Sequence, residues 1–255
     1  MTPEEVIAAV SPTFSQAGSA WYFVPETLAL GKAAGLDGLR FYFLGRGGTL
    51  GRVDWRVVCS AFGYFKPSLV ERMWTTARER CSVEAAVSAH LGACADFGRR
   101  RLGEVGGLGS FCEAADQVVA GAVGDLGGLT LFAAYAGQPL PEDLPARAAQ
   151  LIATLRELRG SAHLTAVRAT GLATPVAHAI RRPADIELFG WGRGEAPEPT
   201  EEDRHRLGEA DRITDRILLR PYADLDARAG EALVAGAKAV AATLATEPPV
   251  PGSRE

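Results

Sequence analysis

Apolar residues recur at helical spacing along nearly the whole chain. Apolar side chains that return every three to four residues form one face of an amphipathic helix, whereas half-buried strands need strict alternation. Start and stop signals fit helices too, since Thr2 and Pro3 suit a helix N-terminus and Gly35 suits a helix end. The pattern predicts helices over residues 2–10, 25–34, 37–44, 54–62, 68–80, 82–102, 111–123, 129–136, 144–158, 161–170, 174–182, 200–220 and 226–244.

No segment is predicted to be a strand. The short aromatic runs at 21–24 and 40–44 come nearest, and their flanks favour a bend and a helix. We therefore expect an all-α protein, with one multi-helix, bundle-like domain over residues 1–246. The glycine-rich stretch 124–128 is a candidate sub-boundary inside it, and 190–199 has the composition of a linker. Three prolines in 247–255 predict a disordered tail.

Charge and composition narrow the compartment and the partners. The 255 residues carry a formal net charge of −4, which does not favour a nucleic-acid partner. No apolar run reaches the ~18 residues of a membrane span, and the first residues lack the pattern of a signal peptide. The four cysteines, at 59, 81, 94 and 112, lie in apolar or helical contexts and are expected to be reduced thiols. These features predict a cytoplasmic protein with no membrane partner.

Familiar catalytic and metal motifs are missing from the sequence. There is no CxxC pair, no HExxH and no GxSxG, and four histidines are too few for a histidine-rich metal site. We therefore expect neither a metal nor a cofactor. The glycine-rich segment 45–51 fits no phosphate-binding motif and follows a predicted helix, so we interpret it as a helix end and turn.

Two predicted helical faces carry polar residues that are candidates for a site. Arg46 ends an apolar stripe that contains Phe43, where a cation complements the helix dipole or binds a carboxylate, phosphate or carbonyl group. Arg159 and His163 lie four residues apart on one face. His163 is either an acid–base group, because the pKa of histidine lies near neutrality, or a hydrogen-bonded core residue.

Further candidates lie on the charged helix predicted for 200–220 and in the aromatic-rich first part of the chain. Thr214 and Asp215 belong to the charged helix, where a solvated face with salt bridges is the simpler explanation. Tyr64 lies among the aromatic residues, where an apolar pocket is most readily formed. We predict one pocket with His163 and Arg46 as its catalytic residues. Its predicted ligand-binding residues are Arg159, Tyr64, Phe43, Thr214 and Asp215.

Two arginine runs, 99–101 and 181–182, either contact nucleic acid or lie at exposed helix ends. Nothing aromatic is interleaved with them, as it would be in many nucleic-acid surfaces.

Several segments resemble an actinobacterial family of SalK-like, helix-turn-helix-type proteins. They are FYFLGRGGTLG at 41–51, the aromatic cluster and KPSLV at 57–70, LRELRGSAH at 155–163, and the residues around Thr214 and Tyr222. The resemblance implies an all-helical protein with a helix-turn-helix or winged segment between His163 and Thr214. That stretch is contracted here, and the first histidine of the family's LREHRGxGH is Leu158. Both departures weaken the DNA-binding interpretation.

Three functions follow from these observations. The first is a helical small-molecule-binding protein, an accessory enzyme of bacterial specialised metabolism of the isomerase, cyclase or lyase type, whose ligand is apolar with an acidic or carbonyl group. The second is a ligand-responsive helix-turn-helix regulator. The third is a protein that binds or sequesters the ligand without catalysis. The sequence leaves open whether the chain is an enzyme and whether it forms a homodimer.

Overall fold

The structure is a computed structural model, and it describes residues 1–192, 194–195 and 198–245. Within these residues the chain is all-helical and has no strand, which confirms the predicted fold class. The predicted tail at 247–255 lies outside the described residues. The helices are α1 (Pro3–Ala17), α2 (Pro25–Ala33), α3 (Gly38–Gly48), α4 (Trp55–Phe62), α5 (Pro67–Arg78), α6 (Val83–Leu102), α7 (Leu108–Val123), α8 (Thr130–Ala136), α9 (Leu144–Ala169), α10 (Thr174–Arg181), the 3-10 helix η1 (Pro183–Asp185), α11 (Glu201–Tyr222) and α12 (Ala227–Ala245).

Two predicted helix breaks are wrong. We expected the first helix to stop before Ser11-Pro12, but α1 continues to Ala17. Pro12 removes one backbone donor, and the burial of Val10 and Phe14 on either side keeps the helix in place. We also expected a break near Gly160, but α9 runs without interruption because a glycine inside a helix costs only about 1 kcal/mol.

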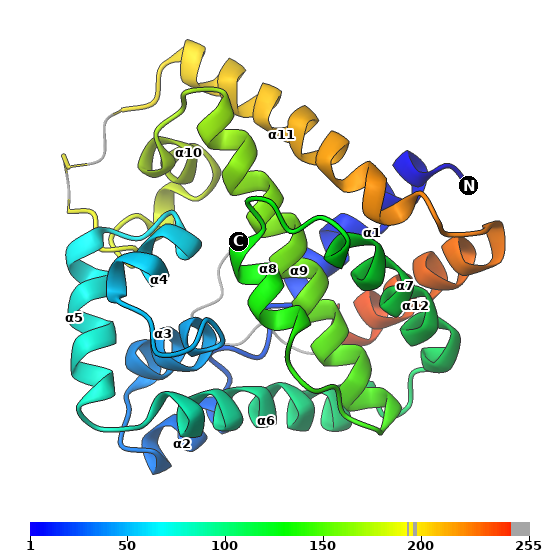
Figure 1. The fold of residues 1–255 in the computed structure, drawn as a ribbon, viewed down its shortest axis with the longest axis horizontal. Helices are drawn as coiled ribbons and strands as arrows, with labels where there is room; N and C mark the ends of the chain where they lie inside the picture. The colour runs from blue at the N-terminus through cyan, green and yellow to red at the C-terminus, as the bar shows by residue number, and fades with distance from the viewer. Residues whose placement is uncertain (193, 196–197, 246–255) are drawn as a thin grey trace.

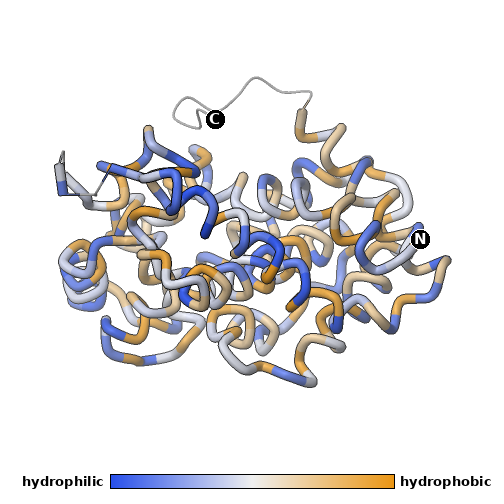
Figure 2. The backbone as a smooth tube through the Cα atoms, turned by 90° about the horizontal axis from the view of Figure 1, so that it is seen from above, coloured by the Kyte–Doolittle hydropathy of each residue, from blue (hydrophilic) through white to orange (hydrophobic). Residues whose placement is uncertain are grey.

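Helix α9 is the central element of the fold (Figure 1). Helices α1, α6, α7, α8 and α11 all pack against it. A helix with neighbours on most sides must be apolar around most of its circumference, and α9 buries residues in almost every turn. At one end of the molecule lie α2 to α5, and at the other lie α7 and α12. Figure 2 shows hydrophilic and hydrophobic residues alternating along the outer helices, as amphipathic helices require.

The helix N-termini follow the expected chemistry. The side chains of Asp37, Asp54, Ser82 and Asp143 each accept a hydrogen bond from a backbone N–H in the first turn of the helix that follows. Each bond satisfies one of the four N–H groups that a helix leaves free. Thr200 closes a capping box with Asp203 at the start of α11.

No helix in the described part of the chain is long and apolar enough to cross a membrane.

Candidate functional site

Helices α4 and α5 form a helix–turn–helix unit. Helix α4 has eight residues and ends at Phe62, and α5 starts at Pro67 after a turn of four residues that begins with Gly63. Gly63 has φ +75°, a conformation that glycine adopts without the steric cost paid by other residues. A short turn that contains glycine between two helices is typical of the DNA-binding motif.

The inner face of the unit is packed against α3. Helix α5 contacts both α3 and α4, and the buried side chains of the unit include Phe62, Phe65 and Trp74. Gly47 on α3 allows this close approach, because a Cβ there would lie 2.9 Å from Val58 and 3.3 Å from Trp74. The Nε of Arg40 on α3 donates a 2.8 Å hydrogen bond to the Thr76 hydroxyl on α5. Three mutually packed helices therefore fix the orientation of α5.

The outer face of α5 is exposed and polar. It presents Ser68, Glu71, Arg72, Thr75 and Arg78 to solvent. Residues 52–80 contain six basic and three acidic side chains, although the whole chain has a net charge of −4. Arg72 has no ion pair with any residue that the structure describes. Basic side chains thus outnumber acidic ones within this stretch, and Arg52 and Lys66 pair with Glu84 and Glu195 from outside it.

The turn between α4 and α5 is attached to the rest of the molecule. A Cβ on Gly63 would lie only 2.4 Å from Leu164 of α9. The Lys66 backbone N–H donates to the carbonyl of Phe189 at 2.9 Å, and the Trp191 indole N–H donates to the carbonyl of Tyr64 at 2.9 Å. The rings of Phe65 and Phe189 stack with their centroids 4.0 Å apart.

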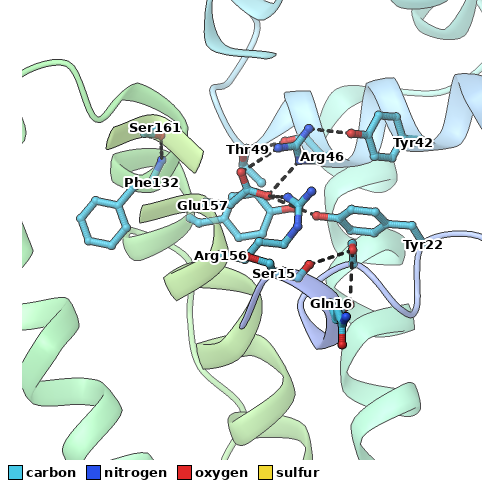
Figure 3. Close-up of polar contacts among 12 residues, drawn as sticks. Ser15, Gln16, Tyr22, Tyr42, Arg46, Thr49, Phe132, Arg156, Glu157 and Ser161 are labelled. Atoms are coloured by element: carbon cyan, nitrogen blue, oxygen red, sulfur yellow. Dashed lines mark hydrogen bonds and ion pairs between the residues drawn. The ribbon is translucent and has the colours of Figure 1, made fainter. Parts of the chain in front are cut away.

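Arg46 lies in a buried polar cluster between α3 and α9 (Figure 3). Its Nε and Nη2 donate to the two carboxylate oxygens of Glu157 at 2.9 and 2.7 Å, and its Nη1 donates to the Tyr42 hydroxyl at 2.6 Å. The Tyr22 hydroxyl and the Arg156 guanidinium also donate to Glu157, at 3.2 and 2.9 Å. All three guanidinium nitrogens of Arg46 therefore have internal partners, and the cluster joins α3 to the central helix.

Charge complementarity keeps Glu157 ionised. Burial by itself raises the pKa of Glu157, but the positive charges of Arg46 and Arg156 outweigh it, so the pKa lies below its usual value. Burial by itself lowers the pKa of Arg46, but the negative charge of Glu157 outweighs this effect, so the pKa of Arg46 lies above its usual value. The cluster is thus a charged network in the interior.

A second polar cluster lies between α9 and α11. Arg159 pairs with Asp215 at 3.0 Å, and the His163 Nδ1 lies 3.0 Å from the Thr214 hydroxyl. That hydroxyl donates its only proton to the carbonyl of Ala210 at 2.7 Å, so we infer that the His163 Nδ1 carries a proton and donates. Burial lowers the pKa of His163, which favours the neutral ring.

The structure thus brings together four of the predicted site residues: Arg159, His163, Thr214 and Asp215. Arg46 belongs to the other cluster, between α3 and α9. The roles of these five residues in catalysis or ligand binding stay predictions. Phe43 is fully buried among aromatic rings, with Phe62 stacked 5.4 Å away, centroid to centroid.

Tyr64 lies near α10. Its ring is 6.1 Å from that of His178, and its buried hydroxyl has no hydrogen-bond partner among the described residues.

Two cavities of the described structure lie elsewhere. One, of about 580 Å³, is lined by Leu28 and Lys32 of α2, the loop residues 35–37 and Gly38 of α3. The other, of about 320 Å³, lies between the end of α7, the loop before α8, α9 and α11. Neither is lined by Arg46 or His163. No group of three or more histidine, cysteine or acidic side chains in the described residues is arranged to hold a metal ion.

The arginine run at 99–101 is engaged by neighbours within the molecule. Arg99 pairs with Asp96 and Asp143, and Arg100 pairs with Glu26. The Arg101 guanidinium lies 5.7 Å from the centre of the Phe97 ring. These contacts place the run at the exposed C-terminal end of α6.

Sequence reasoning missed Glu157, Tyr22 and Arg156. The sequence carries little signal for Glu157, because it shares a helical face with the polar residues Gln150, Thr154 and Ser161. Such a face predicts exposure to solvent, whereas the structure buries it. A carboxylate on such a face needs a buried cation.

Comparison with known proteins identifies the family. A helix-turn-helix family model matches residues 7–188, which is more than half of the chain. The chain belongs to this helix-turn-helix family. The match includes α4–α5 and also α9–α10, and it stops before α11. No curated protein and no solved structure matches the chain. Membership weighs against our expectation that nucleic acid is not a partner. That expectation rested on the charge of the whole chain, whereas binding depends on local charge, and on the contracted stretch between His163 and Thr214.

Proposed function

We propose that the protein binds double-stranded DNA through the α4–α5 unit, with α5 as the helix that enters the major groove. The observation that carries this proposal is the exposed polar face of α5, held on a three-helix support after a four-residue turn. In helix-turn-helix proteins the second helix contacts base edges with residues near its N-terminus.

Specific side chains of α5 suit base recognition. Ser68, Glu71, Arg72 and Thr75 lie on its exposed side, within the first nine residues of the helix. The Arg72 guanidinium can donate two parallel hydrogen bonds to the O6 and N7 of a guanine. Because Arg72 has no ion pair in the described structure, DNA binding would not have to break one.

Nearby arginines suit contacts to phosphate. Arg52 pairs with Glu84 and Arg56 pairs with Asp54, and all four side chains are more than half exposed. Exposed pairs of this kind contribute little to stability, so a phosphate can replace the carboxylate at low cost. Arg78 lies on the exposed side of α5 as well.

Helices α9 and α10 form a second helix–turn–helix, with Gly171 in the turn at φ +74°. This is the stretch in which the family resemblance implied the DNA-binding segment. We favour α5 over α10 because every residue of α10 before Arg181 is buried or half-buried, whereas α5 exposes polar side chains from Ser68 to Thr75. Helix α10 also has only eight residues, whereas α5 has twelve.

In vitro selection tests the proposal. The full chain is incubated with duplexes that carry about 20 randomised base pairs, and bound DNA is sequenced over several rounds. We expect one motif to be enriched, and the variant Arg72→Gln to lose the preference at one guanine, a loss of discrimination of about 1–3 kcal/mol. Arg216→Gln removes the same charge from an exposed position on α11 and should keep the motif. The absence of any motif with the wild-type chain, or an unchanged motif with Arg72→Gln, would overturn the proposal.

A second candidate function is small-molecule binding at the α9–α11 cluster, as in a ligand-responsive regulator or an enzyme. It is favoured by His163, because Thr214 holds its Nδ1 and leaves Nε2 to accept a proton or hydrogen bond. If His163 is an acid–base group, His163→Ala lowers turnover by ~10²–10⁴-fold without unfolding the chain. Calorimetry of the wild type and of His163→Ala with apolar carboxylic acids and ketones tests this candidate. The candidate fails if no compound binds in a way that depends on His163.

We further propose that the chain belongs to the SalK-like branch of the family, from an actinobacterium, and that it acts in the cytoplasm on genes or compounds of specialised metabolism. These parts of the proposal are supported by the quoted sequence segments and by the reduced state expected of the cysteines. In the structure all four cysteines are free.

A further inference from the structure

The segment that follows η1 is docked on the start of α5. One backbone hydrogen bond, one hydrogen bond from the Trp191 indole and one aromatic stack attach Phe189 and Trp191 to the turn before α5, as described above. Gly190, with φ +87°, lies so close that a Cβ would be 3.0 Å from Leu69 and 3.2 Å from the Cβ of Lys66. This close approach fixes where the chain goes next.

Beyond Gly190, an acidic side chain reaches the basic residue at the head of α5. Both carboxylate oxygens of Glu195 accept from the Lys66 ammonium, at 2.6 and 2.8 Å. The Gly192 backbone N–H donates to the same carboxylate at 2.6 Å and orients it. Lys66 precedes the first residue of α5, and no side chain caps this end of the helix.

This position is one that a DNA phosphate would take. The N-terminus of a helix carries a partial positive charge, and an ammonium group beside it increases the attraction for an anion. The carboxylate of Glu195 is bound by the same donor that a phosphate would need. The pair is accessible to competition, because the side chains of Lys66 and Glu195 are 30% and 47% exposed.

We propose that Glu195 is an intramolecular competitor of DNA, which occupies Lys66 in the free protein and is displaced when a phosphate binds there. The proposal rests on DNA binding through α5. In this arrangement, Glu195 lowers the affinity for DNA in general, while the exposed residues further along α5 set the preference for sequence.

Fluorescence anisotropy with a labelled duplex of about 30 base pairs, at fixed salt near 0.1 M, tests the proposal. The variants are Glu195→Gln, Lys66→Gln and the double variant, with Glu198→Gln as the matched control. Glu198 is an exposed carboxylate three residues along the chain, and its loss changes the net charge equally. Thermal melting checks that each variant is folded.

Glu195→Gln should bind DNA about three- to fivefold more tightly than the wild type, since breaking an exposed ion pair frees one cation for phosphate. The gain should disappear in the Lys66→Gln background, because there is then no ammonium to release. Glu198→Gln should give a clearly smaller gain. If the wild type binds and Glu195→Gln behaves like Glu198→Gln, the competition is refuted while DNA binding stands. If neither the wild type nor any variant binds DNA, both proposals fail.

Discussion

Replacing Glu157 by glutamine removes the carboxylate that four donor atoms share inside the protein. The donors are the Nε and Nη2 of Arg46, the Tyr22 hydroxyl and the Nη1 of Arg156. The Glu157 side chain is 2% exposed and that of Arg46 is 9% exposed, so water cannot solvate the Arg46 guanidinium once its anionic partner is lost. The variant keeps the size of the side chain and changes only its charge and its capacity to accept hydrogen bonds.

The expected loss is large, because a buried cation without its partner is destabilising. Removing one partner of a buried pair costs about 3–5 kcal/mol, which is a large part of the 5–15 kcal/mol of a typical domain. In a chain of this length each kcal/mol lowers the melting temperature by about 2–4 °C. We therefore expect Glu157→Gln to melt about 6–20 °C below the wild type, by circular dichroism at 222 nm.

A matched control separates burial from the loss of charge. Glu84→Gln breaks the Arg52–Glu84 pair, whose side chains are 73% and 60% exposed, and should leave the melting temperature almost unchanged. The pH dependence gives a further check. Because the pKa of Glu157 is lower in the folded state, its contribution is complete above about pH 4.3 and is lost as the pH falls towards the folded pKa. Glu157→Gln should lack this acid-dependent loss. A Glu157→Gln protein that melts with the wild type would refute the account of Arg46 as a buried structural cation.

Three further changes test other parts of the structure. A side chain at a positive φ costs ~1–2 kcal/mol. Gly63→Ala should cost more than this in denaturant unfolding, because its Cβ would also lie 2.4 Å from Leu164. Gly171→Ala, with φ +74° and no atom within 4 Å of its Cβ, should show the cost of the positive φ alone. Burial lowers the pKa of His178 to about 4, so the neutral ring contributes stability that falls as the pH drops from about 6.5 to 4, and His178→Phe should reduce this loss in melts across that range. Cys59 and Cys81 should react with iodoacetamide before the buried Cys94 and Cys112, as mass spectrometry of the native protein would show, and early labelling of Cys94 would contradict its burial.

The helices of this fold are largely predictable because their signals are local. Apolar spacing, N-terminal caps and glycine ends all act within a few residues, and they correctly indicate α4 and α5 as separate helices. The errors at Pro12 and Gly160 have a common cause. Each residue weakens a helix locally, and burial of its neighbours in the tertiary structure compensates.

The polar clusters are less predictable because their partners are distant in the sequence. Arg46 and Glu157 are 111 residues apart, and nothing near either residue specifies the other. The grouping of Arg159 with His163 needed only helical spacing, and it holds. The helix–turn–helix at 55–78 corresponds to two predicted helices, 54–62 and 68–80, with a short break between them, whereas the family resemblance implied a DNA-binding segment between His163 and Thr214.

Hydrogen–deuterium exchange, with and without the duplex enriched by selection, tests most directly whether α5 is the DNA-binding helix. The account predicts that DNA slows amide exchange in the α4–α5 turn and in the first half of α5, around Arg72, and leaves α10 and α12 unchanged. Protection confined to α10, or to any surface that excludes α5, would contradict it.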